Sequence, residues 1–403
     1  MRILVVQESD WIEVGTHDIH HLMERLAVLG DEIRVIDFEI RWHQREHGDA
    51  FSRRKVIFGV HKVVEEAQIT IIRPPIMKLP ILDYLSLIVT HWFEIRRQIK
   101  EFKPDLIIGL GILNTKFASN LANKNGIPFI HYLLDELHRL VPQKYLSSLA
   151  KTIERSNLRN ADIIIVTNNA LKDYAISMGA NEERTIVLPH GVDVKKYGSS
   201  NQRKRIREEY QLNDNDIVLF FMGWLYESSG LDILAKALIE SNIPNMKLMI
   251  VGKGELWDRL QEISKEEKGA RKIILVGWKD YREIADMISA SDICILPSKR
   301  VEMMENIVPI KILEYMAAGR PVIVTDLPGI RKEFGENNGI LYVDDCRGIP
   351  RFSKELTSSN ALEHYGSQAR IRASQNDWPV IMERFKSISG EAIARVGKPP
   401  RSE

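Results

Sequence analysis

Residues 309–323 read Pro-Ile-Lys-Ile-Leu-Glu-Tyr-Met-Ala-Ala-Gly-Arg-Pro-Val-Ile, and this stretch decides the fold. Pro309 suits the first turn of a helix, and Gly319 suits its C-terminal end. Pro321 then leads into an apolar strand, and another apolar strand, Ile293–Leu296, precedes the helix. A strand, a helix and a second strand in this order are typical of parallel βαβ units.

The same alternation extends outward over both halves of the chain. Most of the runs are apolar throughout, as strands covered on both faces by helices must be. The predicted strands are 3–6, 33–36, 69–73, 106–109, 129–133, 163–167 and 185–188, and then 217–222, 247–251, 273–276, 293–296, 321–325 and 340–343. The pattern restarts after a polar linker, 198–202, and the charge run 203–205. We therefore expect two α/β domains, residues 1–197 and 205–375.

Composition limits the possible functions. The chain has 403 residues, with 56 Lys and Arg against 55 Asp and Glu, and this balance argues against a nucleic-acid partner. Its only cysteines, Cys294 and Cys346, cannot form a disulfide framework or a zinc cluster. We find neither a signal-peptide pattern at the N-terminus nor an apolar run of membrane-spanning length, so we expect a cytoplasmic protein.

Two segments depart from the regular alternation. Residues 41–55 are polar and suggest a long loop or an insertion. Residues 74–103 are apolar and then basic, which suits a crossover helix with a solvated basic face. The alternative is an amphipathic helix resting on anionic lipid, which would place the protein peripherally on the inner face of a membrane.

The helix after Pro309 offers a site for an anion. Exposed amides at a helix start attract groups such as a diphosphate, and Lys311 adds a cation there. Glu314 lies about one turn further on, where its carboxylate could accept hydrogen bonds from ribose hydroxyls. The alternative is an ordinary amphipathic helix whose Lys and Glu are solvated.

The segment from Glu314 to Val322 resembles the donor-site signature of the GT-B glycosyltransferases of family 4 (glycosyl transferases group 1). Members carry two glutamates with seven residues between them. Glu314 matches the second, whereas Asn306 occupies the position of the first and Glu305 is displaced by one residue. In the family the first glutamate contacts the transferred sugar, so the resemblance gives this role to Glu305, with Asn306 as its competitor.

The resemblance covers nearly the whole chain, and it marks a divergent member. Residues 188–197 are similar to the family's interdomain hinge, and residues 221–232 are similar to its first C-domain strand and the following loop. Trp224 and Ser229 stand where the family has an Arg and a Lys on the diphosphate. The candidates to replace those cations are Lys253, Lys299, Arg300 and Lys311, together with hydroxyls and amides of the loop from Ser228 to Gly230.

The resemblance also implies how the other parts of the donor site are used. Gly277 and Trp278 follow a strand where the family reads the nucleotide base, and Trp278 either stacks on the base or ribose or packs beside a loop. Gly15 lies in a small loop that approaches the donor phosphates. The donor-binding residues that we predict are Gly15, Gly223, Ser228, Ser229, Gly230, Lys253, Trp278, Asn306, Ile310, Lys311 and Glu314.

Two polar groups in the N-terminal half are further candidates. Asp135 and His138 follow the strand 129–133, where the family has a polar residue near the transferred sugar. We predict that they orient the acceptor, as catalytic residues with Glu305. The alternative is a helix N-cap Asp and a surface His. His17, His20 and His21 suggest a metal, but capping and packing roles are favoured.

The resemblance implies a GT-B fold, two facing Rossmann-like domains, with residues 376–395 forming a C-terminal crossover helix. It also implies transfer of a sugar, with retention of anomeric configuration, from a nucleotide-sugar donor to a saccharide, lipid-linked or polysaccharide hydroxyl. Neither a metal nor a cofactor is expected. The alternatives are a GT-B sugar-nucleotide epimerase and a catalytically silent GT-B partner protein.

Overall fold

The computed structural model describes residues 1–39, 51–79, 82–141, 144–199, 201–359 and 361–396. These residues form two compact units. Unit 1 comprises residues 1–189 and the C-terminal residues from 381 on, and unit 2 comprises residues 190–380. Each unit has its own sheet and its own apolar core. The α/β fold predicted from the sequence is therefore confirmed.

Unit 1 is built on an eight-stranded sheet with the order β3-β4-β2-β1-β5-β6-β7-β8. All neighbouring strands are parallel except β3 and β4. The strands are β1 (Arg2–Gln7), β2 (Glu32–Ile36), β3 (Lys55–Val60), β4 (Ile69–Arg73), β5 (Leu106–Leu110), β6 (Phe129–Leu133), β7 (Ile163–Val166) and β8 (Thr185–Val187). Every residue of β5, β6 and β7 is buried, as expected for strands covered on both faces.

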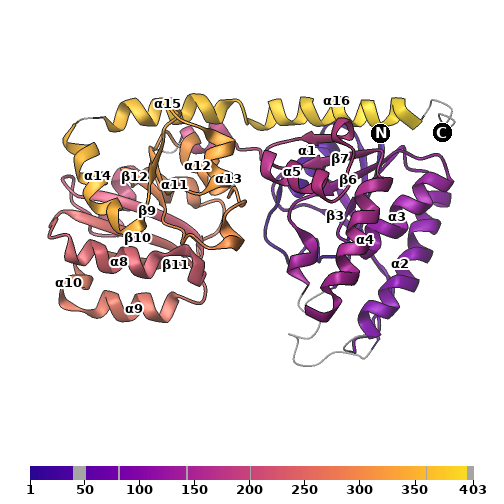
Figure 1. Ribbon diagram of the computed structural model, residues 1–403, viewed down its shortest axis with the longest axis horizontal. Helices are drawn as coiled ribbons and strands as arrows, with labels where there is room; N and C mark the ends of the chain where they lie inside the picture. Colours follow the sequence, from indigo (N-terminus) through magenta and orange to yellow (C-terminus); the bar gives the residue numbers. More distant parts are fainter. Residues whose placement is uncertain (40–50, 80–81, 142–143, 200, 360, 397–403) are drawn as a thin grey trace. The chain divides into compact units, whose positions relative to one another are not determined.

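Helices cover this sheet. They are α1 (Asp18–Val28), α2 (Leu82–Glu101), α3 (Leu113–Lys124), α4 (Ser147–Asn160) and α5 (Asn169–Ser177). Helices α2, α3 and α4 pack side by side in that order, and α3 lies against β5 (Figure 1). Helix α2 connects β4 to β5, so the interpretation of the 74–103 segment as a crossover helix is confirmed. Among the described residues, no helix is long and apolar enough to cross a membrane.

The edge strand β3 was not predicted. The loop proposed for residues 41–55 ends earlier than expected, because β3 begins at Lys55 and Phe51 forms a bridge with Met77. Residues 40–50 lie outside the described part. Strand β3 pairs antiparallel with β4, and each of its residues is at least partly exposed. Its residues 56–60 are apolar, but unlike β5, β6 and β7 none of them is fully buried.

Unit 2 is built on a six-stranded parallel sheet with the order β11-β10-β9-β12-β13-β14. Its strands are β9 (Ile217–Trp224), β10 (Met246–Lys253), β11 (Ile273–Gly277), β12 (Ile293–Leu296), β13 (Val322–Thr325) and β14 (Ile340–Val343). Its helices are α6 (Val194–Gly198), α7 (Arg203–Glu209), α8 (Leu231–Glu240), α9 (Trp257–Lys265), α10 (Glu267–Ala270), α11 (Ile284–Ser289), α12 (Lys311–Ala317), α13 (Pro328–Phe334), α14 (Ile349–Ser358) and α15 (Leu362–Ser374).

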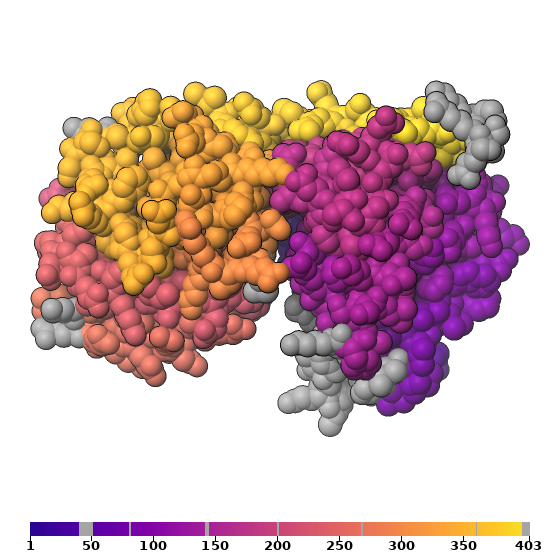
Figure 2. Space-filling model, viewed as in Figure 1, coloured from indigo at the N-terminus to yellow at the C-terminus, as the bar shows by residue number. Residues whose placement is uncertain are grey.

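The helices of unit 2 form two layers. Helices α8, α9 and α10 pack together on one face of the sheet, whereas α6, α11, α12 and α15 pack together on the other (Figure 1). Figure 2 shows the surface of this unit, where α8 and α9 are salmon and α13 and α15 are orange and yellow. The sheet is thus covered on both sides, and its loops carry the candidate site.

The long C-terminal helix α16 (Trp378–Val396) follows α15 closely in the sequence. From Ile381 on, its residues belong to unit 1, where Arg384 donates a hydrogen bond to the carbonyl oxygen of Val187 at 3.0 Å. The chain therefore passes from unit 1 into unit 2 and returns to unit 1. Gly198 and Gln202, at the ends of the linker predicted from the sequence, both lie within unit 2.

Candidate functional site in unit 2

The strand order of unit 2 places a topological switch point at β9. Strand β10 pairs with one side of β9 and β12 pairs with the other. The connections from these strands therefore leave in opposite directions, which opens a crevice at the carboxyl ends of β9 and β12. Ligands of open α/β sheets bind in such crevices.

Glycines line the strand ends at this edge. Gly223 in β9 has a φ of 127°, and Gly252 in β10 has a φ of 153°. A Cβ atom on Gly252 would lie 1.9 Å from the carbonyl oxygen of Gly223, so only glycine allows the two strands to approach this closely. The edge therefore presents backbone rather than bulky side chains.

Two lysines lie beside these glycines. A Cβ atom on Gly223 would come within 2.5 Å of Lys311 Nζ, which lies 4.5 Å from the centre of the Phe221 ring. Burial lowers the pKa of Lys311 to about 8, although the charge of Glu314 raises it. Lys253 is the last residue of β10 and is paired in register with Trp224 of β9.

These two lysines differ from the other cations proposed from the sequence. Lys299 Nζ lies 3.9 Å from carboxylate oxygens of both Glu227 and Asp232, and Arg300 lies 3.6 Å from Asp344. Among the described residues, no carboxylate lies within 4.0 Å of Lys253 or Lys311. Lys253 and Lys311 are therefore the cations that remain available to an anionic ligand.

The start of α12 differs from the expectation. The helix begins at Lys311, with Ile310 as its N-cap, so Pro309 precedes the helix rather than lying in its first turn. Gly319 has a φ of 67° immediately after the C-cap Ala318, which confirms its predicted place at the helix end. The Lys311 ammonium lies at this edge, beside Gly223.

An aromatic cluster stands at the same edge. The ring centres of Trp224 and Trp278 are 5.6 Å apart, and both side chains are about half exposed, at 45% and 57%. Lys253 Nζ lies 5.1 Å from the first ring centre and 4.7 Å from the second. Exposed indole faces beside a cation suit a flat ring attached to an anionic group.

Glu314 is buried in a polar network that the sequence did not predict. It is 7% exposed, and the hydroxyl of Tyr197 donates to its Oε1 atom at 2.6 Å. Burial raises the pKa of the Glu314 carboxyl, whereas the hydrogen bond from Tyr197 and the charge of Lys196 lower it. Lys196 Nζ lies 3.6 Å from the ring centre of Tyr281. The carboxylate is thus held in one orientation by side chains from α6 and from the loop after β11.

The loop after β9 is shaped by Gly230, the N-cap of α8. This residue has a φ of 69°, and a Cβ atom on it would lie 2.1 Å from the carbonyl oxygen of Pro297, which follows β12. The absence of a side chain at Gly230 therefore allows the loop after β9 to pack closely against the segment after β12. Ser229 is buried and donates its hydroxyl to the Tyr226 carbonyl oxygen at 2.7 Å, while the Ser228 carbonyl accepts from the Lys299 amide. Lys299 thus supports the loop as well.

Glu305 and Asn306 follow the short helical turn 302–304 and are both exposed. Their backbone packs against Gly329 of α13, whose amide donates to the Glu305 carbonyl oxygen at 2.6 Å. The structure therefore fixes the backbone at this point while both side chains reach solvent. Either side chain remains a candidate for contact with a transferred sugar.

Candidate residues in unit 1 are described separately. A Cβ atom on Gly15 would meet nothing within 4 Å, so nothing in unit 1 requires glycine there. His17 caps α1, and the ring of His20 accepts from the His17 amide at 3.1 Å, which confirms the capping role. The alternative of a surface His138 is wrong: the side chain is buried, and its Nδ1 atom lies 2.9 Å from Glu154 and 3.0 Å from the hydroxyl of Tyr174.

The carboxyl ends of β1 and β5 carry groups that the sequence did not single out. Oε1 of Glu8 accepts a hydrogen bond from the Asn114 amide at 2.6 Å, and a Cβ atom on Gly111 would touch the Glu8 side chain at 2.9 Å. Burial raises the pKa of Glu8 to about 7, although backbone hydrogen bonds lower it.

Asp135, which was predicted from the sequence, lies after β6. It accepts a hydrogen bond from the Glu136 amide at 2.8 Å, and burial raises the pKa of its carboxyl.

Replacing Glu8 by glutamine is expected to change how stability depends on pH. Because the folded protein keeps the Glu8 proton up to a pKa of about 7 and the unfolded chain loses it near 4.5, wild-type stability falls as pH rises between these values. Glu8→Gln cannot ionise, so it should melt a few degrees higher than wild type at pH 8 and at the same temperature at pH 4. Calorimetric melting across this range is the measurement, and parallel profiles would contradict the assignment.

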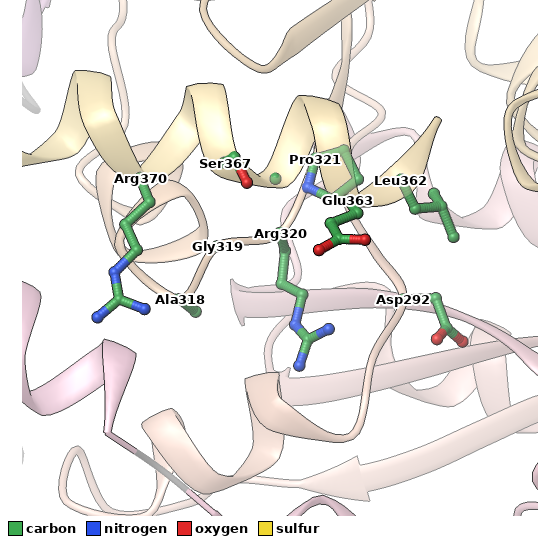
Figure 3. A pocket seen from close by; sticks show the side chains of 10 residues that line it. Asp292, Ala318, Gly319, Arg320, Pro321, Leu362, Glu363, Ser367 and Arg370 are labelled. Atoms are coloured by element: carbon green, nitrogen blue, oxygen red, sulfur yellow. The ribbon is translucent and has the colours of Figure 1, made fainter. Parts of the chain in front are cut away.

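Unit 2 has a cavity of about 410 Å³ at the opposite edge of its sheet from the crevice. It lies beneath α15 and includes Arg320, Arg370 and Asp292 (Figure 3). Arg320 donates to the Ser289 carbonyl oxygen, and Asp292 is paired with Arg203 at 2.6 Å. Since this cavity lies at the amino ends of β12 and β13, it is not the site that the switch point predicts.

Among the described residues, no group of three His, Cys, Asp or Glu side chains is placed to hold a metal ion. His17, His20 and His21, at the start of α1, are described residues and belong to no such group.

Two family models match the chain, one for each unit. The model "Glycosyltransferase Family 4" matches residues 16–196, and the model "Glycosyl transferases group 1" matches residues 202–356. The second match contains the glycine-lined edge, both lysines and Glu314.

Individual proteins agree with these matches. The uncharacterized glycosyltransferase MJ1069 of Methanocaldococcus jannaschii is 25% identical over 59% of this chain and 60% of its own length. The UDP-Gal:alpha-D-GlcNAc-diphosphoundecaprenol alpha-1,3-galactosyltransferase of Escherichia coli is 28% identical over 56% of this chain and 58% of its own length. The alignments thus span about three-fifths of these relatives. The structure of Anabaena HepE in complex with UDP superposes with a TM-score of 0.72 at 17% identity, covering 96% of this chain and 99% of that one.

Proposed function

Because the chain belongs to the GT-B glycosyltransferases of family 4, we propose that it transfers a sugar from a nucleotide-sugar donor to an acceptor hydroxyl. The observation that carries the proposal is the pair of lysines, Lys253 and Lys311, beside the glycine-lined ends of β9 and β10. A nucleoside diphosphate is an anion with a flat base at one end. Cations, bare backbone and exposed indoles are the groups that such a ligand requires.

The donor is proposed to lie across the crevice of unit 2. The diphosphate contacts Lys253 and Lys311. These two lysines take over from the Arg and Lys of the family, whose positions hold Trp224 and Ser229 in this chain. The base stacks on Trp278, whose ring is 57% exposed. The Glu314 carboxylate accepts hydrogen bonds from the ribose hydroxyls, either in place of the hydrogen bond from Tyr197 or in addition to it. The UDP bound to HepE supports a nucleotide ligand for this fold.

The proposed reaction retains anomeric configuration. The bond between the anomeric carbon and the diphosphate oxygen breaks, and the diphosphate leaves with the electron pair. The acceptor oxygen attacks the same face of the sugar and gives its proton to the departing phosphate oxygen. The lysines stabilise the charge that develops on this leaving group, which is the main means of catalysis open to a site without a covalent intermediate. Glu305, with Asn306 as the alternative, contacts the transferred sugar.

No metal is required in this proposal, because the two lysines supply the positive charge that the diphosphate needs. Asp135 and His138 in unit 1 orient the acceptor hydroxyl. The name of the Escherichia coli relative supports a lipid-linked saccharide as one acceptor class. A saccharide or polysaccharide acceptor is the other class that the family offers.

A transfer assay tests the proposal. The full chain is incubated with UDP-, GDP- and ADP-sugars and a panel of saccharide acceptors, with and without EDTA, and products are read by mass spectrometry and NMR. We expect a new glycoside with the donor's anomeric configuration and no effect of EDTA. An epimerised donor without glycoside would support an epimerase, and nucleotide binding without turnover would support a silent partner protein. An inverted product or loss of activity in EDTA would contradict the proposed chemistry.

A further inference from the structure

Unit 1 contains a cavity of about 510 Å³ that the donor site does not use. It lies at the carboxyl ends of β1, β5 and β6 and is bounded on its other sides by α1, α2 and α4. Its volume falls in the usual range for small-molecule sites, about 300–1,000 Å³. The cavity is therefore large enough to hold part of a substrate.

The cavity coincides with the topological switch point of unit 1. Strand β1 pairs with β2 on one side and with β5 on the other, so the crevice opens between the ends of β1 and β5. Gln7, Glu8 and Ser9 from the end of β1, and residues 110–113 from the end of β5, line the cavity. Ligands are expected at this place in an open α/β sheet.

The lining divides into a small polar end and a large apolar wall. Gln7, Glu8, Ser9, His17 and His20 supply most of the polar groups, and Tyr84 and Tyr132 also line the cavity. The wall is formed by aliphatic side chains from the β5–α3 connection and from the segment that leads into α4, including Ile112, Leu113, Leu137, Leu146, Leu149 and Ile153. Such a lining matches a molecule with a polar end and a long apolar body.

The apolar wall continues onto the surface. Leu140 and Leu149 line the cavity and are nevertheless 59% and 58% exposed. Tyr145, between them in the sequence, is 75% exposed. Leaving such side chains in water costs about 25 cal/mol for each Å² of apolar surface, so an apolar occupant that covers them is favoured. A chain longer than the cavity would continue along this surface.

We propose that the cavity binds the hydrocarbon chain of a lipid-linked acceptor and thereby selects acceptors that carry one. This inference rests on the proposed sugar transfer, because it names the class of molecule that receives the sugar. The polar part of the acceptor lies toward Glu8 and His17, at the ends of the strands, and its isoprenoid or acyl chain lies along Leu113, Leu149 and Ile153. A raised pKa of Glu8 is the consequence of the same apolar surroundings.

A binding experiment tests the proposal without turnover. The full chain is titrated into 11-(dansylamino)undecanoic acid, whose emission rises and shifts to the blue when the probe leaves water. We expect saturable binding. Leu149→Asp should weaken it by tenfold or more, because it places a charge against the chain. Val89→Asp is the matched control, since Val89 is also an exposed apolar residue on a helix of unit 1, 54% exposed, and does not line the cavity.

The outcomes separate this proposal from the proposed function. Glu314→Gln should bind the probe as wild type does, because Glu314 belongs to unit 2. In transfer assays, wild type should prefer dodecyl over methyl glycosides of one sugar, and Leu149→Asp should lower kcat/KM for the dodecyl glycoside alone. Absence of saturable binding, or equal weakening by Leu149→Asp and Val89→Asp, would overturn the proposal. Both variants should melt at the wild-type temperature, because both positions are exposed. Such normal melting excludes misfolding as the cause of weaker binding.

Discussion

Glu314→Gln is expected to reduce nucleoside diphosphate affinity by between about tenfold and about 150-fold and to remove sugar transfer. The estimate corresponds to the loss of hydrogen bonds to a charged acceptor, about 1.5–3 kcal/mol. Glutamine keeps the shape of the side chain, and the replaced carboxylate is buried with a raised pKa, so the variant should fold. Calorimetric titration with UDP, GDP and ADP gives the affinity, and the transfer assay gives the rate.

Tyr197→Phe is the control for this prediction. It removes the hydroxyl that donates to Glu314 at 2.6 Å but keeps the ring and the carboxylate. If Glu314 contacts the ribose, Tyr197→Phe should weaken nucleotide binding far less than Glu314→Gln. Equal losses in the two variants would show that Glu314 acts by supporting the local structure, and normal binding by Glu314→Gln would remove it from the site.

Lys311→Met is expected to weaken nucleoside diphosphate binding by at least about tenfold while nucleoside binding stays unchanged, because the lost contact is charge-assisted. The pH dependence gives a second signature. Since the pKa of Lys311 is lowered to about 8, the lysine loses its charge as pH rises through 8. Wild-type affinity for UDP should therefore fall above pH 8, and this fall should be absent in Lys311→Met. Titrations between pH 6.5 and 9.5 measure both effects.

Lys299→Met is the matched control for Lys311→Met. Lys299 lies 3.9 Å from both Glu227 and Asp232, so its charge is already balanced by carboxylates. We expect it to change UDP affinity by less than about threefold, because the lost pair with Glu227 is exposed and the buried Asp232 keeps its ion pair with Arg259 at 3.2 Å. A larger loss in Lys299→Met than in Lys311→Met would reverse the assignment of the diphosphate cations.

Much of the fold was predictable, because buried parallel strands require apolar runs that can be read directly. The limits of β4, β6, β12 and β14 agree with the prediction residue for residue. Strand β3 was missed because it is exposed and pairs antiparallel at an edge. Its residues 56–60 are apolar, but the sequence does not show that this short run pairs antiparallel at the edge of the sheet.

The candidate site was only partly predictable. Lys311 and Glu314 could be found because they lie in one short motif. Tyr197, which holds Glu314, is 117 positions away, and no local pattern links the two residues. The cavity of unit 1 was missed for another reason: Leu113 and Leu149 have the sequence pattern of ordinary core residues, and only the strand order shows that they surround a space.

The central claim is that the carboxyl edge of β9, β10 and β12 binds the nucleotide of the donor. The most direct measurement is a crystal structure of the full chain with UDP. We predict a diphosphate within hydrogen-bond distance of Lys253 and Lys311 and a ribose on Glu314. A nucleotide bound instead in the cavity between Asp292 and Arg370, at the opposite edge of the same sheet, would contradict this account.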